Sequence, residues 1–497
     1  MKLFQRIYLF NYVLLAAILA ILGSIIYWVA AWFVELPYAN LVLLFAVLPV
    51  LFLYVRIRQC ASYVDIQLCE KLQEPGAFVV HKKEYPQYQF VDVYRALERV
   101  LENHTVVSHI RSAHHETLSE ILNSDMYSDD NRNCKTPTAL PYPIDLDQEE
   151  YLESDGFRIV DIDNNGETSR VVVRLRVTHQ PRAELEVAAK EGELASNIIT
   201  AISDTARRNS IYRGKCIELQ FDSNVDSYGD IETQNAFTIQ FKSRTEVSED
   251  DIILDPGVQQ VIERNVIDFH RRRDRLAEAG LPKKRGLLFY GPPGTGKTFT
   301  CKHIACRLPE ATVIFAVGSS LLYIKSVCNV ARMLQPTVVV LEDVDLVFSQ
   351  RESNPFVTAL GTLLDELDGV SDDDEIIFIL TTNAIERLEE AVRDRPGRIS
   401  QCVPISAPTP PLRERYFRRL LRDYKSEDVD LDELVAKTEG STQAFIKEFV
   451  FRAVQVATEN GRSPNGPVAL TNKDFNIALE EMTAGAGRHS LSIIGFR

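Results

Sequence analysis

Metal-ligand motifs are missing from this sequence of 497 residues. Its eight cysteines are scattered in no metal-ligand pattern, and no His-Glu-x-x-His motif occurs among its nine histidines. These absences exclude a zinc metallopeptidase of that type and a dense disulfide framework. We therefore expect reduced thiols in a cytosol-like compartment.

A surplus of basic residues is missing too. The sequence has 55 Lys and Arg against 70 Asp and Glu, a formal net charge of -15. A sequence-independent nucleic-acid binder needs a broad basic face to displace counterions from phosphate. The run Arg271-Arg272-Arg273 lies between Asp268 and Asp274 and is typical of a solvated helix face. We expect protein or peptide substrates, and nucleic-acid pumping is a minor hypothesis that rests on this run alone.

Two long apolar runs are present at the amino end. Residues 7–34 exceed the roughly 20 residues that cross a bilayer, and residues 38–55 lie near the lower limit. Basic residues precede the first run and follow the second, but none lies between them, so both ends are expected on the cytoplasmic side. We predict a transmembrane hairpin over residues 1–60, in a bacterial inner membrane or an organelle membrane. One span followed by an interfacial helix is the alternative.

No catalytic signature occurs in residues 61–248. Apolar positions at helical spacing predict helices within residues 89–123 and 183–208, so an α+β region is expected. Strands are predicted at residues 170–177, 215–221 and 235–241. Residues 124–155 are rich in Asp, Asn and Pro and are predicted to form a polar loop. The role of this region stays open.

A glycine-rich loop stands between a short strand-like run at residues 286–290 and a helical stretch at residues 298–308. Strand, loop and helix in this order are the context that a phosphate-binding loop requires. Its backbone N–H groups and the helix dipole attract phosphate oxygens, Lys297 reaches the β/γ-phosphates and Thr298 offers a hydroxyl to Mg²⁺. The loop comprises Gly291, Pro292, Pro293, Gly294, Thr295, Gly296, Lys297 and Thr298.

Two further strands end in polar residues. The apolar, β-branched run at residues 337–341 leads into Glu342 and Asp343, and the run at residues 376–380 leads into Asn383. Carboxylates at the carboxyl end of a parallel strand beside a phosphate loop can hold Mg²⁺ and polarise an attacking water. The first of these is therefore predicted to be a Walker B strand, and the second to end in a γ-phosphate or water sensor.

An arginine-rich run follows at residues 393–398, Arg-Asp-Arg-Pro-Gly-Arg. It holds more arginines than helix capping needs, and these suit stabilisation of charge on a transferring phosphoryl group in trans. Such a role requires a neighbouring subunit, so a homo-oligomer is expected.

Taken together, the motifs GPPGTGKT, LEDVD, TTN and RPGR, in this order and spacing, resemble the AAA family of ring-forming ATPases over about residues 250–490. The resemblance implies an α/β fold, a P-loop AAA module with a parallel sheet and flanking helices at residues 249–405. It also implies a small helical lid at residues 406–490, before a tail at 491–497. A ring, expected to be a hexamer, with ATP and Mg²⁺ as cofactors is implied as well.

By the same resemblance, Glu342 takes the metal-facing place with Thr298, and Asp343 takes the water-activating place. The implied catalytic set comprises Glu342, Asp343, Asn383 as sensor 1, and the arginine fingers Arg395 and Arg398. The acids read Glu-Asp where most of the family reads Asp-Glu, an inversion shared with the branch that contains the mitochondrial Rieske-protein translocase. The shorter Asp343 must reach its water from further back, so slow hydrolysis is expected. The loop before the arginine fingers is one residue longer than is common in the family, which makes Arg393 an alternative to Arg395.

Tyr323, with Ile324 and Lys325, stands where AAA unfoldases place the pore loop that grips substrate. A core tyrosine in a helix is the alternative. In the lid motif, Gln443 replaces the usual glycine, which leaves the adenine-side contacts open.

Two functional hypotheses follow. The first is an oligomeric ring that uses ATP hydrolysis on the cytoplasmic face of a membrane to unfold, translocate or remodel proteins. The second is a nucleotide-switched membrane scaffold with little turnover, which the inverted acids motivate.

Overall fold

The computed structural model describes most of the chain in two compact units, Met1–Ile211 and Tyr212–Arg497. The described residues are 72, 78–110, 117–123, 139–164, 166–178, 182–221, 237–244, 247, 251–345, 365–366, 369–386, 399–461 and 467–483. Among them, no helix is long and apolar enough to span a membrane. The hairpin predicted over residues 1–60 lies outside the described residues.

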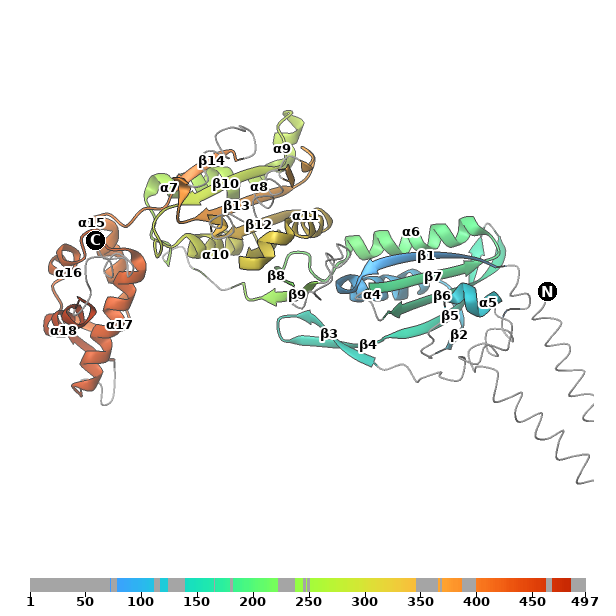
Figure 1. The fold of residues 1–497 in the computed structure, drawn as a ribbon, viewed down its shortest axis with the longest axis horizontal. Coiled ribbons are helices and arrows are strands. Elements are labelled where there is room, and N and C mark those ends of the chain that lie inside the picture. Colours follow the sequence, from blue (N-terminus) through green and yellow to red (C-terminus); the bar gives the residue numbers. More distant parts are fainter. Residues whose placement is uncertain are drawn as a thin grey trace, which may run out of the picture. The chain divides into compact units, whose positions relative to one another are not determined.

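The first unit is built on a five-stranded antiparallel sheet of order β1-β7-β6-β5-β2. Its strands are β1 (Val79–Pro86), β2 (Thr105–Ile110), β5 (Asp155–Asn164), β6 (Glu167–Val177) and β7 (Arg182–Ala189). Its helices are η2 (Gln87–Gln89), α4 (Phe90–Leu101), α5 (Leu118–Asn123) and α6 (Gly192–Arg208). Figure 1 shows α4 and α6 alongside this sheet.

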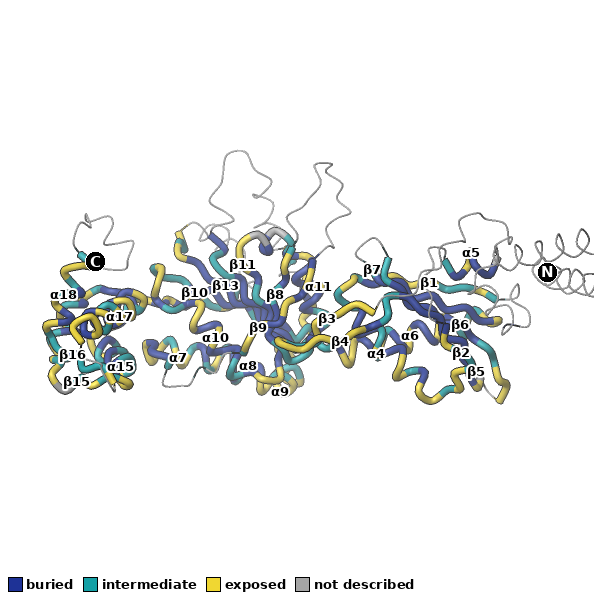
Figure 2. The backbone as a smooth tube through the Cα atoms, turned by 90° about the horizontal axis from the view of Figure 1, so that it is seen from below, coloured by how far each residue is buried: buried dark blue, intermediate teal, exposed yellow. Residues whose placement is uncertain are grey.

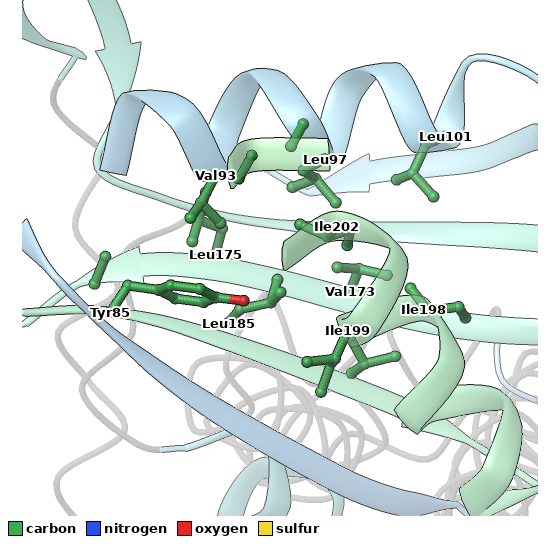
Figure 3. Packing of buried hydrophobic residues seen from close by; sticks show 14 of the residues in the cluster. Tyr85, Val93, Leu97, Leu101, Val173, Leu175, Leu185, Ile198, Ile199 and Ile202 are labelled. Carbon is green, nitrogen blue, oxygen red and sulfur yellow. The ribbon is translucent and has the colours of Figure 1, made fainter. Parts of the chain in front are cut away.

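A close-packed apolar layer joins α4 and α6 to the sheet. Leu97 of α4, Ile202 of α6 and Val173 of β6 are fully buried and belong to one cluster, which Figure 3 shows from close by. Helical spacing on α4 and α6 places these side chains on one face of each helix. The predicted α+β character of this region follows from that layer.

Two predicted helices of the first unit differ from the structure. The helix expected at residues 89–123 ends at Leu101, and the β-branched run that follows forms β2. The helix expected at residues 183–208 begins only at Gly192, because the preceding residues form β7 between β1 and β6. Sheet pairing outweighs the helix propensity of those alanines and glutamates.

The polar loop expected at residues 124–155 contains a hairpin, β3 (Ala139–Asp145) and β4 (Gln148–Glu153). Two aromatic rings anchor it, since Tyr142 of β3 lies 4.9 Å from Phe90 of α4 between ring centroids. Burial raises the pKa of Tyr142 to about 12. Apolar contacts at alternate residues thus order a segment whose composition alone indicates a loop.

A seven-stranded sheet of order β14-β10-β13-β12-β11-β8-β9 forms the core of the second unit. Its strands are β8 (Cys216–Phe221), β9 (Phe237–Lys242), β10 (Arg285–Tyr290), β11 (Thr312–Val317), β12 (Thr337–Glu342), β13 (Ile376–Thr382) and β14 (Gln401–Pro404). All neighbours are parallel except β8 and β9. β13 is buried along its whole length, as expected for a central parallel strand covered on both faces (Figure 2).

Helices flank this sheet, which gives an α/β architecture. They are α7 (Pro256–Ile262), the π-helical η6 (Glu263–Ile267), α8 (Asp268–Arg271), α9 (Arg273–Glu278), α10 (Lys297–Arg307), the 3-10 turn η7 (Gly318–Tyr323) and α11 (Ile324–Met333). The cores of β10, α10 and β12 meet in one apolar cluster that includes Phe289, Ile304 and Val340.

The division between the units differs from the predicted boundary at residues 248/249. β8 pairs in parallel with β11, with Cys216 opposite Val313, so the strands predicted at residues 215–221 and 235–241 extend the second sheet. The second unit therefore begins at Tyr212. Motif positions do not reveal such a pairing, because its partners are nearly a hundred residues apart.

Two arginines hold the carboxyl-terminal ends of α10 and α11. Arg244, which follows β9, donates four hydrogen bonds of 2.6 to 3.1 Å to the carbonyl oxygens of Ala305, Leu308, Gly214 and Ala311. Arg213 donates to the carbonyl oxygens of Met333 and Gln335. Carbonyls at a helix end lack partners within the helix and carry partial negative charge, so guanidinium groups satisfy them well.

A small helical domain occupies the end of the described chain. Its helices are α15 (Pro410–Leu420), α16 (Leu431–Lys437), α17 (Gln443–Glu459) and α18 (Asn472–Thr483), with a short parallel pair, β15 (Lys425–Asp428) and β16 (Ala469–Thr471). Phe417, Phe449 and Phe475 are fully buried in its own core. The helices expected within residues 406–490 thus lie between Pro410 and Thr483.

Candidate nucleotide site

The glycine-rich loop connects the end of β10 to the start of α10 and leaves no room for side chains at two positions. A Cβ atom on Gly291, whose φ is 151°, would lie 2.1 Å from the carbonyl oxygen of Ile405. A Cβ atom on Gly294, whose φ is 79°, would lie 2.9 Å from the Cβ atom of Ala444. Glycine at both positions therefore permits close backbone approach around a short, tight turn.

Lys297 is the first residue of α10 and is only 6% exposed. Its Nζ donates to the carbonyl oxygens of Gly291 at 2.8 Å and Pro292 at 2.9 Å. Burial lowers the pKa of Lys297, and the charges of Asp343 and Asp345 oppose that shift. The ammonium group is thus held inside the loop by neutral acceptors, which an anion can replace.

Thr298 and Glu342 meet across the site. The Thr298 hydroxyl donates to Glu342 Oε2 at 3.2 Å, from the start of α10 to the end of β12. Burial raises the pKa of Glu342, the Thr298 hydrogen bond opposes this, and the charge of Asp343 adds to it. A partly buried carboxylate beside a hydroxyl offers the hard oxygen donors that Mg²⁺ prefers, and a cation there would offset the cost of that burial.

Asp343 and Asn383 form a second pair. Asn383 Nδ2 donates to Asp343 Oδ1 at 3.0 Å, which joins the ends of β12 and β13. The backbone of Asp343 has a φ of 50°, in the left-handed region that aspartate tolerates better than most residues. Its N–H donates to the hydroxyl of Thr381 at 3.0 Å.

Asp345 is a site residue to which the sequence reasoning gave no role. It is 5% exposed, and its Oδ1 accepts from the Thr382 hydroxyl at 2.9 Å and from the Asn383 backbone N–H at 3.1 Å. The available signal was a third acid just after the Walker B pair, matched by adjacent threonines at the end of the next strand.

The start of α17 in the small helical domain contacts the phosphate loop. The Ala444 N–H donates to the carbonyl oxygen of Gly294 at 3.0 Å. Thr442 caps the helix by accepting from the Phe445 N–H. The lid motif noted in the sequence therefore lies directly against the loop, with Gln443 at the first helical position.

The remaining candidates are Tyr323 and the predicted arginine fingers. Tyr323 ends η7, and its ring stacks on Phe221 of β8 with a centroid distance of 4.1 Å and an interplanar angle of 8°. The tyrosine is therefore packed against a neighbouring strand, although it is only partly buried. The predicted fingers Arg395 and Arg398, and the alternative Arg393, lie outside the described residues.

The residues brought together fit a Mg²⁺-nucleotide. The glycine loop presents backbone N–H groups at a helix start, Lys297 supplies a cation, and Thr298 with Glu342 supplies oxygen donors for a divalent ion. Asp343 and Asn383 lie at the carboxyl edge of the sheet, where parallel α/β sheets bind ligands.

Comparison with known proteins agrees with this geometry. Residues 287–406 match the model of the ATPase family associated with various cellular activities (AAA). Over 253 residues the chain is 30% identical to the ATP-dependent zinc metalloprotease FtsH 2 of Thermoanaerobacter sp. (strain X514), which covers 48% of each chain. It is 30% identical to the proteasome-activating nucleotidase of Archaeoglobus fulgidus, over 50% of this chain and 64% of that one.

A third relative is the peroxisomal ATPase PEX6 of Candida glabrata, 31% identical over 48% of this chain and 25% of that protein. The chain thus spans about half to two thirds of the length of the first two relatives.

Proposed function

Because residues 287–406 form an AAA-family ATPase domain, we propose that this protein hydrolyses ATP with Mg²⁺ and works as an oligomeric ring, a hexamer. The observation that carries the proposal is a pair of hydrogen bonds around the phosphate loop, from Thr298 to Glu342 and from Asn383 to Asp343. The first pair offers two oxygens to a metal and the second offers a carboxylate and an amide to a water, which supports the proposal.

Each residue has a distinct part in the proposed reaction. Lys297 exchanges its carbonyl partners for phosphate oxygens and neutralises their charge. Thr298 and Glu342 would hold Mg²⁺, which when bound would neutralise charge on the phosphates. Asp343 accepts the proton of the attacking water, and the Asn383 amide fixes the position of that carboxylate.

Assembly supplies the remaining charge. We propose that Arg395 and Arg398 of one subunit, or Arg393 in their place, reach the phosphates bound by the next subunit. Hydrolysis then depends on ring formation. Arg398→Ala in the full-length protein should lower turnover while leaving nucleotide affinity intact, and equal turnover would remove this finger from the proposal.

Turnover decides between a motor and the competing hypothesis of a nucleotide-switched scaffold. Steady-state phosphate release by detergent-purified full-length protein is compared with that of Asp343→Asn, which keeps the shape of the side chain but cannot take a proton. A wild-type rate well above the mutant rate supports the motor. Equally slow release by both proteins would favour the scaffold.

Protein substrates and a membrane location complete the proposal. Protein remodelling is supported by the acidic composition and by relatives named for proteolysis and proteasome activation. The apolar runs of residues 1–60 support membrane anchoring, with the ATPase domain on the cytoplasmic side. Protease protection of tagged amino- and carboxyl-terminal ends, in sealed vesicles whose cytoplasmic face is outward, tests this orientation. Protection of the carboxyl-terminal end in such vesicles would contradict it.

A substrate-gripping role for Tyr323 competes with a packing role, since its ring is stacked on Phe221. Tyr323→Ala should spare ATP hydrolysis and abolish substrate processing if the residue grips substrate. Loss of stability with unchanged processing would leave Tyr323 as a packing residue.

A further inference from the structure

Side-chain hydrogen bonds take over where the β12–β13 ladder ends. The regular pairing of the two strands stops at Leu341 and Leu380. Beyond it, the Asp343 N–H donates to the Thr381 hydroxyl at 3.0 Å. Asp345 then accepts from residues of β13 and of the turn after it. The two proposed catalytic strand ends are thus cross-linked by side chains rather than by backbone pairs.

Asp345 makes the innermost of these links with a single oxygen atom. Its Oδ1 accepts both from the Thr382 hydroxyl at 2.9 Å and from the Asn383 N–H at 3.1 Å. Asp345 is 5% exposed and Thr382 is fully buried. Thr382 in turn accepts from the Ala384 N–H at 3.0 Å, so the turn after β13 is held at successive residues.

Asn383 is therefore fixed through its main chain, while its side chain fixes Asp343. Its backbone N–H is bound to Asp345, and its Nδ2 is bound to Asp343 at 3.0 Å. If the main-chain bond is lost, the amide group can no longer be aimed at the carboxylate that faces the water. Asp343 is also left in an unfavourable backbone conformation with less to hold it there.

We propose that Asp345 is a positioning residue for ATP hydrolysis, which holds the sensor Asn383, and through it Asp343, in the geometry that activates water. This inference rests on the proposed hydrolysis. It concerns mainly the chemical step, because both hydrogen bonds to Asp345 Oδ1 come from Thr382 and Asn383, at the strand end that holds Asp343. The charge of Asp345 also acts on Lys297, and we expect its effect on nucleotide affinity to be the smaller one. Loss of the two hydrogen bonds that Asp345 accepts, which we call the Asp345 latch, should therefore lower kcat and leave KM for ATP nearly unchanged.

Because one oxygen of Asp345 accepts both hydrogen bonds, two variants of this residue separate the loss of those bonds from the loss of the charge. Asp345→Asn retains an oxygen in the place of Oδ1 and can accept both bonds, whereas Asp345→Ala can accept neither. We expect Asp345→Ala to lower kcat about 10- to 100-fold, the range seen for supporting residues that orient a functional group. Asp345→Asn should stay within about threefold of wild type if hydrogen bonding is what matters.

Thr382 provides an independent test of the same latch. Thr382→Val removes the hydroxyl donor at nearly constant volume, and Thr382→Ser restores it. We expect Val to lower kcat and Ser to rescue it. Asp92→Ala is the matched control, since Asp92 is 4% exposed and accepts a backbone N–H in the first unit, remote in sequence from the site. It should leave kcat unchanged.

A second readout needs no nucleotide. Hydrogen exchange of the nucleotide-free, full-length protein reports the Asn383 N–H directly in peptides that cover residues 376–386. Exchange there should rise in Asp345→Ala, remain at the wild-type level in Asp345→Asn, and stay unchanged elsewhere in the second unit.

The outcomes separate this inference from the function on which it rests. If wild type does not hydrolyse ATP, the proposed function fails, and hydrogen exchange alone decides whether Asp345 holds Asn383. If wild type is active and Asp345→Ala has the same kcat, the inference is overturned. It is also overturned if the kcat of Asp345→Asn is as low as that of Asp345→Ala. A third contrary result is that Asp345→Ala raises hydrogen exchange throughout the second unit and weakens binding of a fluorescent ADP, which indicates a merely structural role.

Discussion

Charged groups are buried in both units of this protein, but their partners differ. In the first unit, Arg174 is fully buried and makes a bidentate pair with Asp155, at 2.7 and 2.9 Å, with Glu186 as a third member at 3.4 Å. In the second unit, the buried Lys297 donates to two neutral carbonyl oxygens. A buried charge that is neutralised by charged side chains of the same unit has a structural role. A buried charge whose hydrogen-bond partners are neutral can still bind a charged ligand.

The largest loss of folding stability should come from removing Arg174 from its cluster with Asp155 and Glu186. Arg174→Ala leaves Asp155 and Glu186 buried without their cation, which should cost about 3–5 kcal/mol of folding stability. Urea unfolding followed by a probe in the first unit measures it. The exposed pair Arg95–Glu150 is the control, because Arg95→Ala should cost less than about 1 kcal/mol. Similar costs for the two variants would contradict the comparison.

Arg244 tests an intermediate case, a partly buried cation that donates to four carbonyl oxygens. Arg244→Ala leaves carbonyls at the end of α10 unsatisfied, and we expect a loss of about 1.5–3 kcal/mol in the stability of the second unit. Thermal unfolding is the measurement, with the surface residue Arg452 replaced by alanine as control. A negligible loss would mean that water replaces the guanidinium without cost.

Lys297→Met should affect binding more than folding. Loss of the charge that faces phosphate should weaken nucleotide affinity about 10- to 100-fold, equivalent to about 1.5–3 kcal/mol. Folding stability should change by less than about 1 kcal/mol, since only bonds to loop carbonyls are removed. Fluorescent ADP titration and thermal unfolding together check this. A large fall in stability with intact affinity would place Lys297 with the structural charges.

The smallest effect concerns Glu186 and pH. Burial raises its pKa above the ordinary 4.5, although the charge of Arg174 opposes the shift. Between the unfolded and the raised folded pKa, the folded chain binds more protons, so this group makes stability fall as pH rises through that window. Glu186→Gln should remove that contribution. The difference in unfolding free energy between wild type and variant, measured from pH 4.5 upward, should vary with pH in this sense, and a constant difference would contradict it.

The nucleotide site was largely predictable because its elements are local. A strand, a glycine-rich loop and a helix follow each other directly, and Glu342 stands at the end of an apolar strand where such acids are expected. The Glu342 contact with Thr298 follows from the common edge of a parallel sheet.

Elements that depend on distant partners were not predictable in this way. β7 contains residues with good helix propensity, but pairing with β1 and β6 makes it a strand. β8 joins the second sheet through β11, and Asp345 gains its role only when β13 lies beside β12. No local pattern reveals these contacts, since loop closure brings them together only in the folded chain.

Helix α10 connects the phosphate loop to the β8–β9 segment, which Arg244 follows in the sequence. α10 has 11 residues and is therefore about 16 Å long, with Lys297 at one end and the Arg244-bound carbonyls at the other. A helix of this length behaves as a stiff strut. If the phosphate loop moves the start of α10, the end of the helix must either move the β8–β9 segment with it or break its hydrogen bonds to Arg244. A movement of the phosphate loop would therefore be transmitted to the β8–β9 segment.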